Sequence, residues 1–210
     1  MLDNYIQLPN GVIKQVEIQK IPYDSNYIQK YNVLGEKGRN MAFYRLGLIL
    51  GNLGFIPNSI LDVGYGNGDF LNACKTIIPN CYGSDISNYN VPDGCSFVNN
   101  IFDQEYDVIT FFDSLEHFDD IYFLNKLKCK YIYITLPWCH YFDDEWFKNW
   151  YHRKPNEHLW HFNDKSLINF FKEQGYTNIN INNFEDAIRK NNLPYSNILG
   201  GLFKKNHISP

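Results

Sequence analysis

The stretch that decides the fold is ILDVGYGNGDFL, residues 60–71. Its first four residues, 60–63, form a short run rich in branched apolar side chains and bounded by glycine, which predicts a buried strand. Gly64, Gly66 and Gly68 follow at alternate positions, where they allow unusual backbone conformations and leave room for a ligand. From Asp69 onward apolar residues recur at helical spacing. Strand, glycine turn and helix together predict the opening unit of a nucleotide-binding α/β sheet, the alternative being a tight turn with no ligand.

A second short strand is predicted near Cys81 and ends in Asp85. In folds of this class an acid at the tip of the second strand meets ribose hydroxyls, so the ligand is expected to contain adenosine. NAD and S-adenosylmethionine both contain adenosine, so Asp85 does not distinguish them. Asp69, however, stands where the pyrophosphate of a dinucleotide would lie, and a carboxylate there repels phosphate and favours a cationic ligand.

The order Asp62, three glycines, Asp85 resembles motif I of class I S-adenosylmethionine-dependent methyltransferases. Two further segments, FFDSLEHF at 111–118 and PNEHLWHF at 155–162, resemble boxes found in the small-molecule enzymes of that family. The resemblance covers roughly residues 23–205. It implies a Rossmann-like, doubly wound α/β fold with a mostly parallel seven-stranded sheet and a closing antiparallel β-hairpin.

Within that frame, later strands are expected at 95–100, 106–113, 131–137, 176–182 and 197–205. Helices are expected before Gly51 or Gly54, over 114–128, and after a cap at Asn163 or Asp164, whereas the helix after the second strand is shortened or lost. We divide the chain into an N-terminal arm and cap (1–40), a methyltransferase domain (41–205) with an acceptor-side insert (138–163), and a tail (206–210). The cap carries tyrosines at four-residue spacing, at 23, 27 and 31.

The resemblance implies S-adenosylmethionine as the cofactor. The residues expected to bind it lie at the ends of successive strands: Asp62, Gly64, Tyr65, Gly66, Gly68, Asp85, Ile86, Asn99, Asn100, Asp113 and Ser114. Asp113 could instead cap the following helix. A catalytic base is needed only for a hydroxyl or protonated amine acceptor, and His117 and His158 are both candidates. A structural hydrogen bond is the alternative role for His117.

The insert 138–163 is aromatic and charged, and we expect it to wall the acceptor pocket. The expected substrate-binding residues are Trp138, His152, Arg153, Glu157, Trp160 and His161, with Trp146, Trp150 and Tyr151 as stacking surface. Arg153 and Lys154 provide a polar handle or, alternatively, a solvated loop corner. The histidines do not have HExxH spacing, so the sequence predicts no metal site.

Composition narrows the choice of partners. The chain has 210 residues, 44% of them hydrophobic, and a formal net charge of −4, so a sizeable core is expected and a nucleic-acid partner is not. The loop after the fourth strand also lacks the Asp/Asn-Pro-Pro-aromatic motif of enzymes that methylate amino groups of DNA bases. Five cysteines without a CxxC pair favour a reducing cytoplasm over disulfides or zinc. No signal peptide or membrane span is predicted, and the protein is expected to be a monomer or homodimer.

Three functions remain open at this stage. The leading hypothesis is methyl transfer from S-adenosylmethionine to an oxygen, nitrogen or carbon atom of a small molecule such as a metabolite or glycan precursor. The second is a non-catalytic module that keeps the cofactor fold for binding or assembly. The third is a nicotinamide-dependent oxidoreductase.

Overall fold

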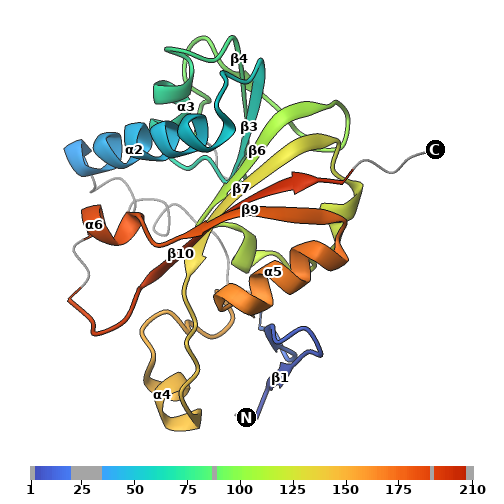
Figure 1. Ribbon diagram of the computed structural model, residues 1–210, viewed down its shortest axis with the longest axis vertical. Helices are drawn as coiled ribbons and strands as arrows, with labels where there is room; N and C mark the ends of the chain where they lie inside the picture. The colour runs from blue at the N-terminus through green and yellow to red at the C-terminus, as the bar shows by residue number, and fades with distance from the viewer. Residues whose placement is uncertain (1–2, 20–34, 87–88, 190–191, 207–210) are drawn as a thin grey trace.

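The computed structural model describes residues 3–19, 35–86, 89–189 and 192–206. Its centre is a seven-stranded sheet in the order β5-β4-β3-β6-β7-β10-β9 (Figure 1). The strands are β3 (Ser59–Val63), β4 (Asn80–Ser84), β5 (Ser96–Phe97), β6 (Tyr106–Phe112), β7 (Cys129–Pro137), β9 (Tyr176–Asn182) and β10 (Ile198–Lys205). β3 to β7 are parallel, whereas β10 runs antiparallel to both β7 and β9. The predicted doubly wound fold with a closing hairpin is confirmed.

Helices cover both faces of this sheet. α2 (Gly35–Leu53), α3 (Asp69–Cys74) and the short α6 (Glu185–Arg189) lie on one side, and α5 (Asp164–Glu173) lies on the other (Figure 1). Side chains alternate along β3 accordingly, since Ile60 packs in the cluster with α2 and α3 while Leu61 packs in the cluster with α5. Parallel strands in this arrangement bring their carboxyl ends to one edge, where ligands of such folds bind.

The amino-terminal arm, whose residues 11–21 are strand-like in sequence, forms a small second sheet. β1 (Tyr5–Gln7) pairs with β2 (Ile13–Gln15), and β2 pairs with β8 (Trp160–His161) of the insert. The insert also contains α4 (Asp144–Asn149) and a bridge between Trp138 and Phe162. Strand pairing thus joins the arm to the insert. The three tyrosines of the predicted cap lie outside the described residues.

The predicted helix over 114–128 is wrong. Two 3-10 turns stand there, η2 (Leu115–His117) and η3 (Tyr122–Lys126), separated by the extended Phe118. The Asp120 carboxylate accepts a hydrogen bond from the Tyr122 amide, which starts the second turn afresh. Leu124 and Leu127 are both fully buried and fix this segment against the core.

Other boundaries shift by smaller amounts. The third strand was predicted to span six residues, 95–100, but β5 contains only two of them. β4 ends one residue before Asp85. α2 runs across the proposed boundary at residue 40. α5 begins at the predicted cap, because Asn163 and Ser166 form a reciprocal capping box, and Gly175 follows it with φ 85°. No helix lies between β4 and β5 among the described residues there, 85–86 and 89–95.

Candidate functional site

The glycine turn lies at the carboxyl edge of β3 and is held from both sides. The Gly64 amide donates to the carbonyl of Ser84 at 2.7 Å, and the Gly66 amide donates to the Asp85 carboxylate at 2.8 Å. On the other side the Ser114 hydroxyl donates to the Val63 carbonyl at 2.7 Å. The ends of β3, β4 and β6 therefore meet at this turn, as the sequence predicted for the cofactor site.

Two glycines of the turn differ in what surrounds them. Both have positive φ, 84° at Gly64 and 54° at Gly66. A Cβ added at Gly64 would lie 2.7 Å from the Cβ of Ser114, whereas one added at Gly66 would meet no atom of the described residues within 4 Å. The protein itself fills the space at Gly64, and the space at Gly66 stays open to a ligand.

Asp62 and Tyr65 are both buried. Asp62 is 2% exposed and accepts a hydrogen bond from the Thr110 hydroxyl at 2.8 Å. Burial, which outweighs this hydrogen bond and the nearby charge of Arg45, raises the pKa of Asp62 to about 7. The Tyr65 side chain is buried against α2 and α3 and donates to the Tyr89 carbonyl. Asp62 and Tyr65 therefore support the turn from beneath.

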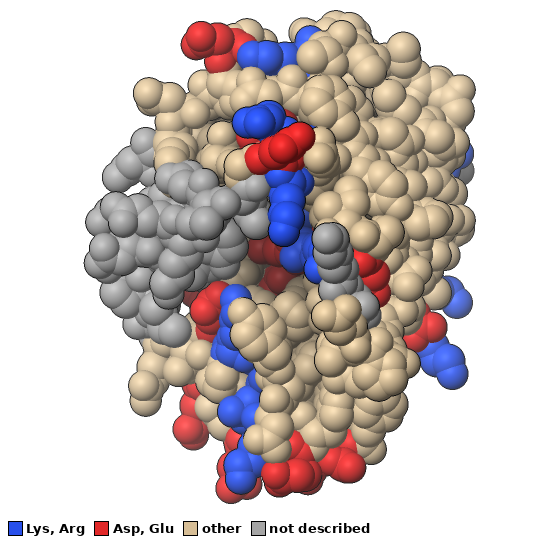
Figure 2. All heavy atoms as spheres, turned by 90° about the vertical axis from the view of Figure 1, so that its left-hand side faces the viewer, with Lys and Arg blue, Asp and Glu red and all other residues tan. Residues whose placement is uncertain are grey.

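Four charged side chains form a network beside the turn. Arg45 of α2 donates through Nε to the Glu185 carboxylate at 2.6 Å, and Arg189 of α6 also binds Glu185. Asp113, at the end of β6, pairs with Arg45 and Arg189. Figure 2 shows acidic and basic side chains gathered in a hollow on the face that carries α2 and α6.

This network fixes the charge of Asp113. Burial alone would raise its pKa, but Arg189 and Arg45 outweigh burial and lower the pKa to about 2. Its backbone has φ 49°, so Asp113 is held in a left-handed conformation that costs free energy. It is not an N-cap of a following α-helix, since none is there. The sequence reasoning missed Glu185 and the role of Arg45, because their partners come from distant elements.

The predicted residues on the β4 and β5 side are exposed. Ile86 has 79% of its surface exposed, and Asn99 and Asn100 are also exposed. The Asn100 side chain closes its own loop by binding the Phe102 amide and the Asp103 carboxylate. Asn100 therefore has a structural role in the loop.

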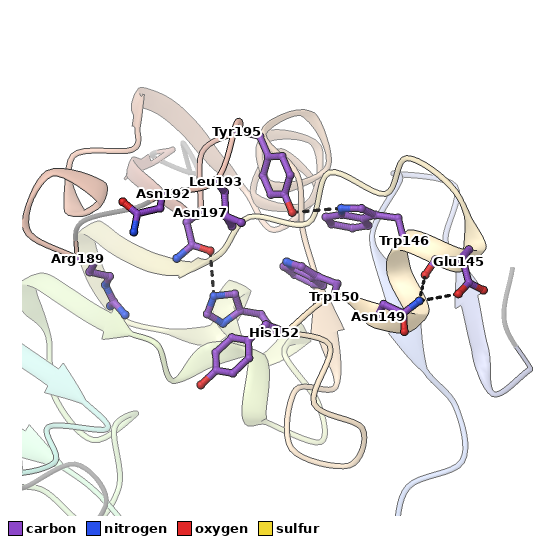
Figure 3. Close-up of a pocket in the computed structure, with 11 residues that line it drawn as sticks. Glu145, Trp146, Asn149, Trp150, His152, Arg189, Asn192, Leu193, Tyr195 and Asn197 are labelled. Atoms are coloured by element: carbon purple, nitrogen blue, oxygen red, sulfur yellow. Dashed lines mark hydrogen bonds between the residues drawn. The ribbon is translucent and has the colours of Figure 1, made fainter.

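A cavity of about 630 Å³ lies next to the charged network. Its walls come from α4, the residues that follow it, α6 and the loop before β10 (Figure 3). They include Glu145, Trp146, Asn149, Trp150, Tyr151, His152, Arg189, Asn192, Leu193, Tyr195 and Asn197. The volume suits a small organic molecule. Arg189 lines the cavity and pairs with Asp113, so it connects the cavity to the strand edge.

His152 orients one wall of this cavity. Its Nε2 lies 3.0 Å from the Asn197 side-chain oxygen, as the dashed line in Figure 3 shows. His140 makes a similar contact, 2.7 Å from its Nε2 to the Ser196 carbonyl, but does not line the cavity. Burial lowers the pKa of His152, so this ring is neutral near pH 7.

The structure places several other predicted substrate residues away from the cavity. Trp160 is 1% exposed in the main core and donates its indole N–H to the Phe118 carbonyl, and His161 is 3% exposed among the aromatic rings around α4. Trp138 stacks on His140, and Arg153 lies over the Tyr5 ring. These residues build the scaffold of the insert and do not line the cavity.

The two candidate bases lie together. The rings of His117 and His158 are 4.7 Å apart between centroids, and Glu116 lies beside them. Burial lowers the pKa of His117 to about 4 and that of His158 to about 2. Both rings are neutral near pH 7 and only weakly basic. Glu157 lies at the same place, in an ion pair with Lys154 at 2.8 Å.

Comparison with known proteins agrees with this geometry. Residues 40–181 match the family described as the methyltransferase domain. The chain belongs to this family. The predicted membership is therefore confirmed. No curated protein sequence is significantly similar to this methyltransferase-domain chain.

Solved structures share the fold of this methyltransferase-domain protein at low identity. The 1,6-didemethyltoxoflavin-N1-methyltransferase of Burkholderia thailandensis is 13% identical, with a TM-score of 0.56, over 97% of this chain and 100% of that one. The magnesium protoporphyrin IX methyltransferase of Synechocystis PCC 6803 is 11% identical, with a TM-score of 0.55, over 90% of each chain. The plantazolicin methyltransferase BpumL is 15% identical, with a TM-score of 0.57, over 88% of this chain and 91% of that one.

None of the helices in the described part of the chain has the length and apolar character needed to span a bilayer.

Proposed function

We propose that this protein transfers a methyl group from S-adenosylmethionine to a small molecule held in the cavity beside α4. The observation that carries the proposal is the open space at Gly66, next to Asp85 and to the network of Arg45, Asp113 and Arg189. The solved structures named above, all methyltransferases of small-molecule substrates or products by their names, contain S-adenosylhomocysteine and support this choice of cofactor.

The charges at the strand edge suit the two ends of such a cofactor. Asp85 at the tip of β4 is placed to accept hydrogen bonds from ribose hydroxyls. The methionine end carries an ammonium and a carboxylate, which match Asp113 and its two arginine partners. No phosphate-binding group is needed.

Methyl transfer requires little covalent chemistry from the protein. The sulfonium is already an activated electrophile, so the protein must hold acceptor, methyl and sulfur in line and exclude water. Positioning of this kind can supply ~7–11 kcal/mol of the barrier. The aromatic walls formed by Trp146, Trp150 and Tyr151 would hold a flat, largely apolar acceptor.

A matched pair of histidine variants tests this assignment. Protein is incubated with methyl-labelled S-adenosylmethionine and a low-molecular-weight cell extract, and label in small products is counted. His152→Ala is expected to lower methyl transfer while leaving the affinity for S-adenosylhomocysteine unchanged, because His152 lines the cavity. His140→Ala, which contacts the same loop from outside the cavity, should leave both unchanged.

Two results would contradict the proposal. Equal loss of transfer in the two variants would mean that the cavity does not hold the acceptor. Binding of cofactor without transfer to any extract would favour the non-catalytic module.

A further inference from the structure

Glu116, His117 and His158 bring three metal-ligand groups together from two distant segments. One carboxylate oxygen and one nitrogen from each ring lie within 4.8 Å of one another. The two segments are fixed side by side, because the Leu159 amide donates to the Glu116 carbonyl at 2.7 Å. The grouping is therefore built into the fold and does not depend on exposed, flexible side chains.

Glu116 is the unusual member of this group. It is 1% exposed, and no other residue in the described part of the chain donates a hydrogen bond to either of its carboxylate oxygens. A buried carboxylate without a donor is costly, and a bound cation would satisfy it.

Both imidazoles are oriented in the manner of metal ligands. His158 makes a 2.8 Å hydrogen bond from Nδ1 to the His152 carbonyl, so Nε2 is the nitrogen able to bind a metal. His117 hydrogen-bonds the backbone of Glu157. A backbone carbonyl on one ring nitrogen fixes the tautomer and presents the other nitrogen as a ligand.

We propose that Glu116, His117 and His158 bind one divalent transition-metal ion. Two imidazoles and a carboxylate suit Zn²⁺, Co²⁺, Fe²⁺ or Mn²⁺, whereas Mg²⁺ and Ca²⁺ prefer oxygen ligands alone. Three protein ligands leave coordination positions for water or a substrate oxygen. Glu157, whose carboxylate lies 3.9 Å from Nε2 of His158, stands next to the site and is paired with Lys154.

Cobalt titration of tag-free protein tests the site, because Co²⁺ bound by imidazole and carboxylate has visible d–d absorption. The wild type is expected to bind one Co²⁺ per chain, and Zn²⁺ should displace it. His158→Ala and the near-isosteric Glu116→Gln should each weaken binding by at least the roughly 10- to 100-fold that loss of an outer partner costs. His140→Ala, a partly buried histidine outside the cluster, is the matched control with unchanged affinity.

Thermal unfolding verifies that each variant is folded and gives a second readout. Metal should raise the melting temperature of the wild type and of His140→Ala, but not that of the other two variants. Absence of Co²⁺ binding to the folded wild type, or equal binding by all four proteins, would overturn the proposal. Metal binding is measured without methyl transfer, so either proposal can fail alone.

Discussion

The carboxyl edge of β3 and β4 and the segment that follows β6 differ in how they are built. At the first, one continuous stretch from Asp62 to Asp69 supplies strand end, turn and helix start, and Asp85 completes it. At the second, η2 meets residues about forty positions away, as Glu116 and Leu159 do. Local backbone chemistry determines the first region, and tertiary packing determines the second.

The largest expected effect is the loss of folding stability on substituting one glycine of the local region. Gly64→Ala should destabilise the protein by about 2–5 kcal/mol, from backbone strain together with the clash against Ser114. Gly66→Ala carries only the strain, about 1–2 kcal/mol, because its Cβ would meet no atom within 4 Å in the part of the chain that the structure describes. Urea unfolding measures both.

The same pair should reverse its order in cofactor binding. Gly66→Ala places a methyl group in the open space and should weaken S-adenosylhomocysteine binding, while remaining the more stable variant. If Gly66→Ala bound the cofactor as the wild type does, the space at Gly66 would not be the ligand space.

A sharper test of the local region is Asp85→Ala. A carboxylate that accepts ribose hydroxyls contributes about 1.5–3 kcal/mol, so cofactor affinity should fall about 10- to 100-fold. Asp93→Ala, an exposed acid outside the strand edge, is the control. Calorimetric titration measures both, and an unchanged dissociation constant for Asp85→Ala would remove the ribose role.

A further prediction concerns the pH dependence of stability at Asp62. Because its folded pKa is raised to about 7, the stability it contributes is complete below the unfolded pKa and is lost as pH rises through 7. Relative to Asp62→Asn, the wild type should lose about 1.4 kcal/mol per pH unit between about pH 4 and pH 7. Urea unfolding across that range measures the difference, and parallel pH profiles would contradict it.

The same contrast explains what the sequence could predict. The parallel core, the closing hairpin and the glycine turn follow from short runs with clear periodicity or glycine spacing, and the structure confirms them. The helix expected over 114–128 is wrong because Leu115, Phe118, Tyr122 and Leu127 follow one helical face only roughly. The Asp120 carboxylate also starts a new turn there by accepting a hydrogen bond from the Tyr122 amide.

The sequence also could not show which side chains from distant segments come together. Arg45 lies in α2, and only the fold shows that Glu185 and Asp113 meet it. The sequence showed His117 and His158 as separate candidates, and HExxH spacing could not reveal a cluster built across η2 and the insert. Trp160 was expected in the acceptor wall because aromatic composition alone does not distinguish a pocket from a core.

The most direct test of the central claim is calorimetric titration of the purified protein with S-adenosylmethionine and S-adenosylhomocysteine, with NADH as the control. We predict micromolar binding of both methyl-donor forms at one site per chain and no binding of NADH at millimolar concentration. Absence of binding by both, or binding of NADH alone, would contradict the assignment of the glycine turn as a methyl-donor site.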